Sequence, residues 1–322
     1  MRILFLGSGE FAIPTLRSIT HDGHEVVAVI SQPDKPRGRG KGVTPTPVKN
    51  EAMELGLPVL TPENVNAPEV VGRIRSLGAE LAYVAAFGQK IGAELLGAFP
   101  AGIVNLHGSL LPAYRGAAPI QRAVMNGEEE TGVTVFRLVE KMDAGPVLVR
   151  RRTGIGPDET ADELHDRLSR IGCDAVRATL EILQKDPDIP GEEQDHARAT
   201  MAPKLTKAEG RIHFNMPARK LAAIIRGLWS WPGANCRFQS ADGRRDEIVT
   251  LARAVAYTIR TRPAESPDEV GRINDMMRVQ AADADLEILQ IKPAGGRLMD
   301  WQDYVNGRHV AEGDRFVPIE PA

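Results

Sequence analysis

The amino-acid sequence predicts an α/β protein, with a doubly wound, mostly parallel sheet in its first part and a smaller β-barrel at its C-terminal end. Three observations lead to this prediction. Short apolar, strand-like segments alternate with helical segments as far as residue 185. The alternation stops in residues 186–205, which are polar, contain proline and have no periodicity. One helical segment and several strand-like segments follow. We therefore expect a first domain over residues 1–189, a linker over residues 190–205 and a second domain over residues 206–322.

The first domain is predicted from the alternation itself. Strands that alternate with helices form a mostly parallel sheet that is covered on both faces. The first strand is ended by Gly-Ser-Gly, and the second is rich in β-branched residues. The expected strands are residues 2–6, 25–31, 80–87, 102–106 and 133–138, and the expected helices are residues 11–19, 50–56, 68–78 and 160–185.

The second domain is expected to be rich in β-structure. A helix is predicted over residues 217–228. The segments that follow it are short and strand-like, at residues 234–239, 246–257 and 286–294. A run of short strands in a domain of this size is typical of a small barrel.

Net charge and cysteine content limit the possible binding partners and cellular location only broadly. Residues 1–203 carry 22 basic and 27 acidic side chains, a net charge of −5, whereas residues 204–322 carry 18 and 16, a net charge of +2. Contacts with a polyanion must therefore come from local clusters. Cys173 and Cys236 lie far apart, which suits a reduced cytoplasm and supplies neither a disulfide framework nor a metal site. Without a signal peptide or a long apolar run, we expect a soluble cytoplasmic protein.

A glycine turn follows the first strand. Gly7, Gly9 and Ala12 have the G-x-G-x-x-A spacing of a dinucleotide-binding turn. Such sites also need an acidic residue at the end of the second strand, where this chain has Ser31-Gln32-Pro33. We expect a tight strand-to-helix turn that binds no nicotinamide cofactor. The alternative is an NAD(P)-dependent oxidoreductase.

A basic segment follows the second strand. Residues 33–49 carry the cations Lys35, Arg37, Arg39, Lys41 and Lys49, opposed by a single acid. The glycines among them are expected to prevent helix or strand formation. Connections in α/β units are usually about two to six residues long, so this length indicates a function. We expect the segment to contact a phosphate backbone, and the alternative is a solvated loop.

Three polar residues are predicted to converge at the edge of the sheet. Asn105 and His107 stand at the carboxyl end of one strand, and Asp143 follows the next. Ligands of doubly wound sheets bind at these strand ends. Asn105 and a protonated His107 can stabilise an oxyanion, while Asp143 can orient the imidazole and help to move a proton. Because no serine or cysteine is paired as a nucleophile, direct transfer between two bound substrates is expected, without a metal.

These residues resemble the folate-dependent formyltransferases. Asn105, His107 and Asp143 match that family's catalytic asparagine, histidine and aspartate, and Ser109-Leu110-Leu111-Pro112 matches its SLLP segment, which holds 10-formyltetrahydrofolate. The resemblance covers essentially the whole chain and is greatest to the branch that formylates methionyl-tRNA. It implies a Rossmann-like catalytic domain and a C-terminal tRNA-binding barrel that resembles an OB-fold. It also implies that Lys35, Arg37, Arg39 and Lys41 meet the tRNA acceptor arm.

The resemblance implies transfer of a formyl group from 10-formyltetrahydrofolate to the α-amino group of methionyl-initiator-tRNA. The SLLP segment and a loop with Phe87, Gly88 and Gln89 would hold the pterin. We expect a monomer that contacts tRNA and reduced folate but no membrane. Two alternatives stay open besides the oxidoreductase. One is a formyltransferase for an amino sugar or a purine precursor. The other is a non-catalytic RNA-binding module, which would leave the convergence of Asn105, His107 and Asp143 unexplained.

Overall fold

The computed structural model describes residues 1–37, 42–258 and 263–320. The chain divides into two compact units, and each is described by itself. The first comprises Met1–Gly116, Gly132–Thr153 and His165–Met201, and the second comprises Ala117–Thr131, Gly154–Leu164 and Ala202–Ala322. The domain boundaries given above, with a linker at 190–205, stay a prediction.

The elements up to residue 185 confirm the predicted alternation and extend it. They are β1 (Arg2–Gly7), the 3₁₀ helix η1 (Glu10–Ala12), α1 (Ile13–His21), β2 (Glu25–Ile30), β3 (Lys35–Arg37), β4 (Gly42–Thr44), α2 (Pro47–Glu54), β5 (Val59–Leu60), α3 (Pro68–Ser76), β6 (Leu81–Ala85), α4 (Ala93–Leu96), β7 (Ile103–His107), β8 (Arg115–Gly116), α5 (Pro119–Asn126), β9 (Glu130–Arg137), β10 (Val147–Gly154) and α6 (Ala161–Lys185).

The remaining elements follow the polar segment. They are the 3₁₀ helix η2 (His196–Arg198), β11 (Met201–Ala202), the 3₁₀ helix η3 (Ala208–Gly210), α7 (Ala218–Leu228), β12 (Ala234–Gln239), β13 (Asp246–Tyr257), β14 (Val279–Gln280), β15 (Asp285–Pro293), β16 (Met299–Asp300), α8 (Trp301–Arg308) and β17 (Arg315–Val317). No helix among the described residues has both the length and the apolar character needed to cross a bilayer.

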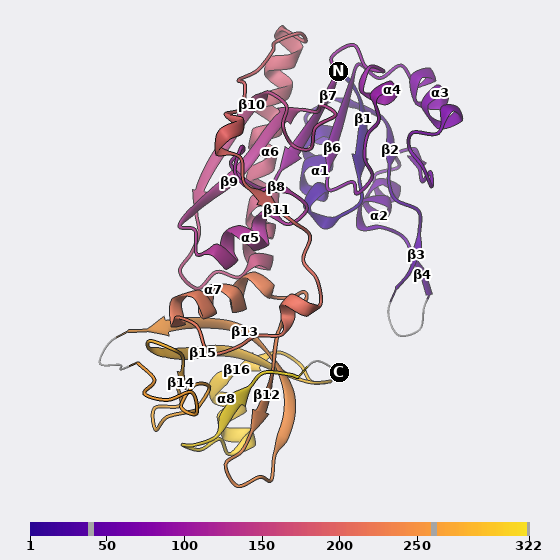
Figure 1. Ribbon diagram of the computed structural model, residues 1–322. Coiled ribbons are helices and arrows are strands. Elements are labelled where there is room, and N and C mark those ends of the chain that lie inside the picture. The colour runs from indigo at the N-terminus through magenta and orange to yellow at the C-terminus, as the bar shows by residue number, and fades with distance from the viewer. Residues whose placement is uncertain (38–41, 259–262, 321–322) are drawn as a thin grey trace. The chain divides into compact units, whose positions relative to one another are not determined.

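The first unit is built on a seven-stranded sheet with the order β10-β9-β7-β6-β1-β2-β5 (Figure 1). β1 pairs in parallel with β2 and β6, and β6 pairs in parallel with β7. The prediction of a mostly parallel sheet is therefore confirmed. β9, which was predicted as a strand at residues 133–138, runs antiparallel to β7, and this direction was not predicted. The carboxyl ends of β1, β6 and β7 consequently meet at one edge of the sheet.

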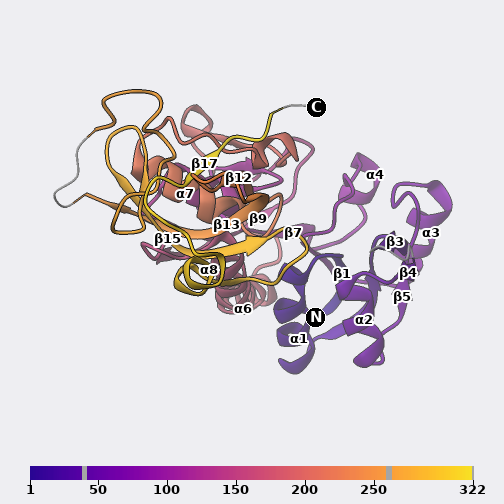
Figure 2. The same cartoon turned by 90° about the horizontal axis from the view of Figure 1, so that it is seen from below.

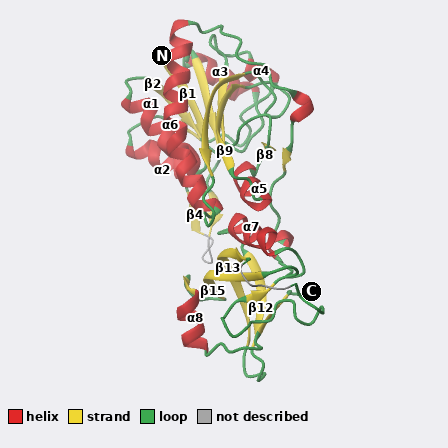
Figure 3. Cartoon of the chain, turned by 90° about the vertical axis from the view of Figure 1, so that its left-hand side faces the viewer, coloured by secondary structure: helices red, strands yellow, loops and turns green. Residues whose placement is uncertain are grey.

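Both faces of this sheet are buried. Successive β1 residues alternate between the two faces, and Ile3, Leu4, Phe5 and Leu6 are all 0–1% exposed. Leu4 and Leu6 belong to a cluster that also contains Ile74 of α3. Figure 3 shows α1 and α6 on one side of the sheet and α3 on the other. Strands buried on both faces explain the continuous apolar runs in the sequence.

The basic segment after β2 is more regular than predicted. β3 pairs antiparallel with β4, so Gly42 lies in a strand and the expectation that glycines exclude regular structure is wrong at this position. α2 begins at Pro47, where Thr46 caps it by accepting a hydrogen bond from the Lys49 backbone at 3.0 Å. Hairpin pairing lets a glycine join a strand because the partner strand supplies the backbone hydrogen bonds.

The second unit contains the predicted barrel. Its sheet has the order β14-β15-β13-β12-β17, and Figures 1 and 2 show α7 against β13. A segment at Gly271 nearly closes the barrel, since the Phe316 amide donates to the Gly271 carbonyl and the Gly271 amide donates to the Gln280 carbonyl, both at 2.8 Å. A Cβ atom on Gly271 would lie 2.1 Å from the Phe316 carbonyl oxygen, so glycine is required here.

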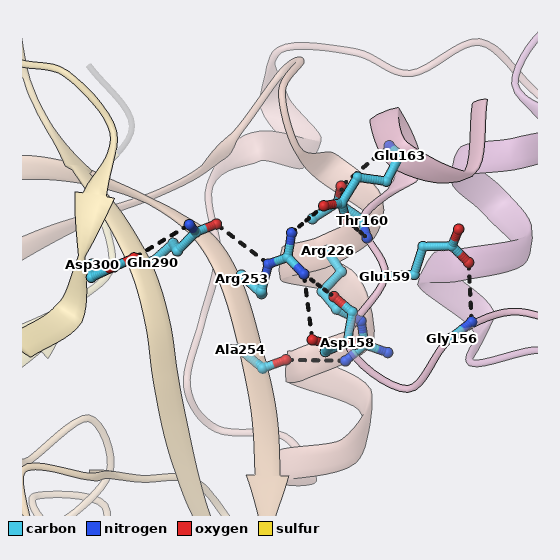
Figure 4. Close-up of polar contacts among 10 residues, drawn as sticks. All are labelled: Gly156, Asp158, Glu159, Thr160, Glu163, Arg226, Arg253, Ala254, Gln290 and Asp300. Atoms are coloured by element: carbon cyan, nitrogen blue, oxygen red, sulfur yellow. Dashed lines mark hydrogen bonds and ion pairs between the residues drawn. The ribbon is translucent and has the colours of Figure 1, made fainter. Parts of the chain in front are cut away.

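An arginine of the barrel fixes the start of α6 in the same unit. Arg253 of β13 pairs with Glu163 and Asp158 (Figure 4). Glu163 also accepts a hydrogen bond from the Thr160 backbone at 2.9 Å, while the Thr160 hydroxyl accepts from the Glu163 backbone at 3.3 Å. This reciprocal pair is a capping box at the beginning of the helix. Burial opposes ionisation of Glu163, but the hydrogen bonds from Thr160 and Arg253 outweigh it and lower the pKa of this carboxyl.

Candidate active site

The predicted residues Asn105 and His107 lie on β7, at the sheet edge formed by the carboxyl ends of the parallel strands. Asn105 is half-buried between Val84 of β6 and Phe136 of β9. Residues two apart on a strand point to the same face, about 7 Å from one another along the strand. The two side chains therefore present an amide and an imidazole from one face of the sheet.

The surroundings of His107 distinguish its two ring nitrogens. The side chain is buried, and its Nε2 atom donates to the Tyr114 carbonyl oxygen at 2.9 Å. Because a carbonyl only accepts, the proton of the neutral imidazole is on Nε2. The Nδ1 atom lies 3.7 Å from Oδ2 of Asp143. That distance is too long for a hydrogen bond but short enough for electrostatic attraction once His107 is protonated.

Asp143 is held in position by its own backbone and by a neighbouring loop. It lies between β9 and β10 with a φ of 47°, a left-handed conformation that is uncommon for a residue other than glycine. Its Oδ2 atom accepts a hydrogen bond from the Gly116 amide at 2.8 Å. The structure thus brings His107 and Asp143 together, as predicted. Tyr114 was missed because its contribution is a backbone carbonyl, which residue type does not reveal.

The four residues of the SLLP segment are not equivalent. Ser109 is fully buried, and its hydroxyl closes the loop by donating to the Ala113 carbonyl at 2.6 Å. Leu111 is 2% exposed and packs in the core. Leu110 and Pro112 are half-buried and can meet a ligand. Side-chain contact with a folate is therefore open to Leu110 and Pro112, while Ser109 and Leu111 shape the loop.

The residues of the loop after β6 also differ in their surroundings. Phe87 is buried in the core, and Gln89 is occupied with a neighbouring loop, accepting from the Val65 amide at 2.8 Å and donating to the Pro62 carbonyl at 3.1 Å. Gly88, with a φ of 84°, is exposed. Of the three residues predicted to hold the pterin, Gly88 is the exposed one, while Phe87 is buried and Gln89 is half-buried.

The glycine turn after β1 is closed by internal hydrogen bonds. The amides of Ser8 and Gly9 both donate to the Ala86 carbonyl, at 3.1 and 3.2 Å. The Ser8 hydroxyl donates to the Phe87 carbonyl at 3.0 Å and accepts from the Gln32 amide at 3.0 Å. Amides that would otherwise face a pyrophosphate are thus occupied.

Two predicted cations of the basic segment have side chains that the structure describes, Lys35 and Lys49. Lys35 is exposed on β3 and lines a cavity of about 490 Å³ beside the glycine turn. Arg37 belongs to the same strand, and Arg39 and Lys41 lie outside the described residues. Lys49 pairs with Asp34 at 2.7 Å. Across the described residues, no group of three or more histidine, cysteine, aspartate or glutamate side chains is arranged to hold a metal ion.

Comparison with known proteins identifies the family. Residues 1–180 match the model of the formyl transferase family, and residues 204–309 match the model of its C-terminal domain. The methionyl-tRNA formyltransferases of Solibacter usitatus and Moorella thermoacetica are each 40% identical to this chain, over 98% of both sequences.

Solved structures agree in fold. HypX from Aquifex aeolicus in complex with tetrahydrofolic acid has a TM-score of 0.61 at 18% identity, covering 97% of this chain and 48% of that one. The sugar 3N-formyl transferase WlaRD has a TM-score of 0.62 at 15% identity, covering 89% of this chain and 97% of that one. Together with the whole-length identity to its curated members, the two family matches show that this chain belongs to the formyl transferase family, in its methionyl-tRNA formyltransferase branch.

Proposed function

We propose that this chain transfers the formyl group of 10-formyltetrahydrofolate to the α-amino group of methionyl-initiator-tRNA, for translation initiation in the cytoplasm. The observation that carries the proposal is an identity of 40% over 98% of the chain with proteins named methionyl-tRNA formyltransferase. Both domains of the family are matched, including the C-terminal one. A shared architecture at this identity favours a shared substrate.

The proposed chemistry is a direct transfer. The neutral amine attacks the formyl carbon, a new C–N bond forms, and the bond from that carbon to the folate nitrogen breaks. One proton passes from the attacking amine to the leaving nitrogen. Asn105 and protonated His107 stabilise the oxyanion of the tetrahedral intermediate, and Asp143 stabilises the imidazolium and assists the proton transfer. Because Nε2 of His107 is engaged by Tyr114, the ring nitrogen that serves the substrate is Nδ1.

The formyl donor is proposed to bind beside the sheet edge. Leu110 and Pro112 would contact it with their half-buried side chains, and the backbone at Gly88 would face the pterin. No nicotinamide cofactor is proposed, and the hydrogen bonds that occupy the Ser8 and Gly9 amides support this.

The tRNA is proposed to meet the basic segment and the C-terminal domain. Residues 33–49 have a net charge of +4, in a chain whose net charge is −3. Lys35, Arg37, Arg39 and Lys41 would contact the phosphates of the acceptor arm, and the monomer would be the active form. The barrel would add affinity and no chemistry, because all three proposed catalytic residues precede residue 180.

The decisive experiment compares acceptors. Labelled 10-formyltetrahydrofolate is incubated with the protein and with charged initiator tRNA, an amino-sugar nucleotide or a purine-precursor amine in turn. We expect label on the methionine of the tRNA and none on the small amines. Label on a small amine alone would favour the alternative formyltransferase, and binding of tRNA without transfer to any acceptor would favour an RNA-binding module.

A further inference from the structure

We propose that Gln194 is a positioning residue for the reaction, because its side-chain amide ties together the two loops that face His107. Gln194 lies in the polar segment after α6 that the sequence predicts to be a linker. Its side chain is nevertheless buried in the first unit, with 5% exposure. A buried amide must satisfy its hydrogen bonds within the protein, so its partners define what it does.

Both the nitrogen and the oxygen of the Gln194 side-chain amide form hydrogen bonds. Its Nε2 atom donates to the carbonyl oxygens of Asp143 and Gly145, at 2.9 and 2.7 Å. Its Oε1 atom accepts from Arg115, at 3.2 Å from Nε and 2.6 Å from Nη2. One side chain therefore joins the loop at 143–145 to the loop at 114–116.

These two loops hold the groups that contact His107. Tyr114 supplies the carbonyl that receives the Nε2 proton, and Gly116 donates to the carboxylate of Asp143. Tyr114 and Asp143 both have left-handed backbones, with φ values of 61° and 47°. Such conformations are unfavourable for residues other than glycine and persist only where the surroundings impose them. Gln194 is hydrogen-bonded directly to the Asp143 carbonyl and to Arg115, which lies between Tyr114 and Gly116.

Arg115 makes this connection rigid. It is 3% exposed, and besides Gln194 its Nη2 atom contacts Nδ1 of His196 at 2.9 Å. Its backbone amide donates to the Thr200 carbonyl at 2.8 Å. Because the guanidinium is planar and its donors are fixed in direction, it sets the orientation of the Gln194 amide, and through it that of the Asp143 loop.

Two substitutions separate the contact with Arg115 from the contacts with the Asp143 loop. Gln194→Glu retains an acceptor for Arg115 but removes the donor to the Asp143 and Gly145 carbonyls. Gln194→Leu removes both the acceptor and the donor. If the Asp143 loop shifts, kcat should fall by about 10- to 100-fold while the KM values for folate and charged tRNA change little, because misplacing a reacting group mainly slows the chemical step.

Arg137→Gln is the matched control. Arg137 anchors the same segment through the carbonyls of Ile189 and Pro187, at 2.8 and 2.7 Å, and its guanidinium also donates to the Ala101 carbonyl at 3.0 Å, which lies outside the Asp143 loop. It should lower the melting temperature and leave kcat near the parent value. An equal loss of kcat in Arg137→Gln would mean that anchoring the segment, and not orienting Asp143, is what matters.

A double-mutant cycle with Asp143→Ala completes the test. This inference rests on the proposed role of Asp143, so that variant is measured first. If Asp143→Ala retains parent activity, the proposed site is wrong. If Asp143→Ala is slow, adding Gln194→Glu should slow it little further, because Gln194 acts through Asp143. Additive losses, or a Gln194→Glu variant with parent kcat, would overturn the role of Gln194 and leave the site intact. Should Gln194→Leu fail to fold, the Gln194→Glu cycle still decides.

Discussion

The Oδ2 atom of Asp143 lies 3.7 Å from the Nδ1 atom of His107, and the same oxygen accepts the Gly116 amide at 2.8 Å. The carboxylate is thus fixed by the backbone and can face the imidazole without being held by it. His107 is held at its other ring nitrogen by Tyr114. This arrangement leaves Nδ1 able to exchange a proton with a substrate while a negative charge lies close by.

Removing the charge of Asp143 should therefore slow the reaction without unfolding the loop. Asp143→Asn can still accept from Gly116, and asparagine tolerates a left-handed backbone. We expect kcat to fall by roughly 10²-fold or more, the scale of lost acid–base assistance. Steady-state kinetics and thermal denaturation check this. Unchanged kcat with a lowered melting temperature would assign Asp143 a purely structural role.

Removing cations from the basic segment should weaken the dependence of tRNA binding on salt. Replacing Arg37, Arg39 and Lys41 together by alanine should raise the KM for charged tRNA. The log–log slope of binding against salt should flatten by about 0.7–0.9 per lost phosphate contact. Replacing Arg73 and Arg75 of α3 serves as a control for charge removal. A slope that does not change in the triple variant would make the segment a solvated loop.

Glu163 should contribute to the stability of the second unit in a pH-dependent way. Its folded pKa is lowered, so its contribution is fully present above the unfolded pKa, near 4.3, and is lost as pH falls through the folded value. Glu163→Gln should cost about 0.5–1 kcal/mol at neutral pH, since the Glu163 side chain is half exposed and its pair with Arg253 is screened by water. In urea unfolding the difference in unfolding free energy between variant and parent should shrink below about pH 4.

Glu63→Gln, at an exposed carboxylate, controls for the change of charge. A difference in unfolding free energy that widened in acid for Glu163→Gln would contradict the lowered pKa of Glu163.

Helix packing in the second unit should not tolerate a methyl group at Gly227. A Cβ atom there would lie 2.3 Å from Cγ of Met125 on α5. Gly227→Ala should therefore destabilise the protein by about 1–3 kcal/mol, measured by urea unfolding. Gly72→Ala on α3 meets nothing within 4 Å and should be neutral or stabilising by up to about 1 kcal/mol. If both alanines had the same effect, this close approach of the two helices would be wrong.

Local pattern was sufficient to predict β1, β2, β6, β7 and the barrel, but not the two-residue parallel strand β5 or the connections that depend on the rest of the fold. Apolar runs such as residues 2–6 and 25–31 identify buried strands directly. The antiparallel edge at β10 has alternating buried and half-exposed positions and no helix before it, so the alternation did not include it.

The candidate site was predictable only where residue type is informative. The approach of His107 to Asp143 was expected because both are polar residues at strand ends, and their catalytic role, with that of Asn105, stays a prediction. The carbonyl of Tyr114 and the amide of Gly116 were not, because any residue supplies these groups. Gln194 was not predicted because its sequence neighbours are exposed and charged, and only the folded chain buries its side chain.

The most direct test of the account is formyl transfer to charged initiator tRNA in a single turnover, with both substrates saturating. The parent protein is compared with Asn105→Ala and His107→Ala, and His21→Ala, at an exposed position on α1, is the control. We predict that each site variant still binds folate but transfers the formyl group at least about 10²-fold more slowly, as expected for a lost oxyanion donor, while the control matches the parent. Transfer at the parent rate by either site variant would contradict the assignment of Asn105 and His107 as the groups that carry out the reaction.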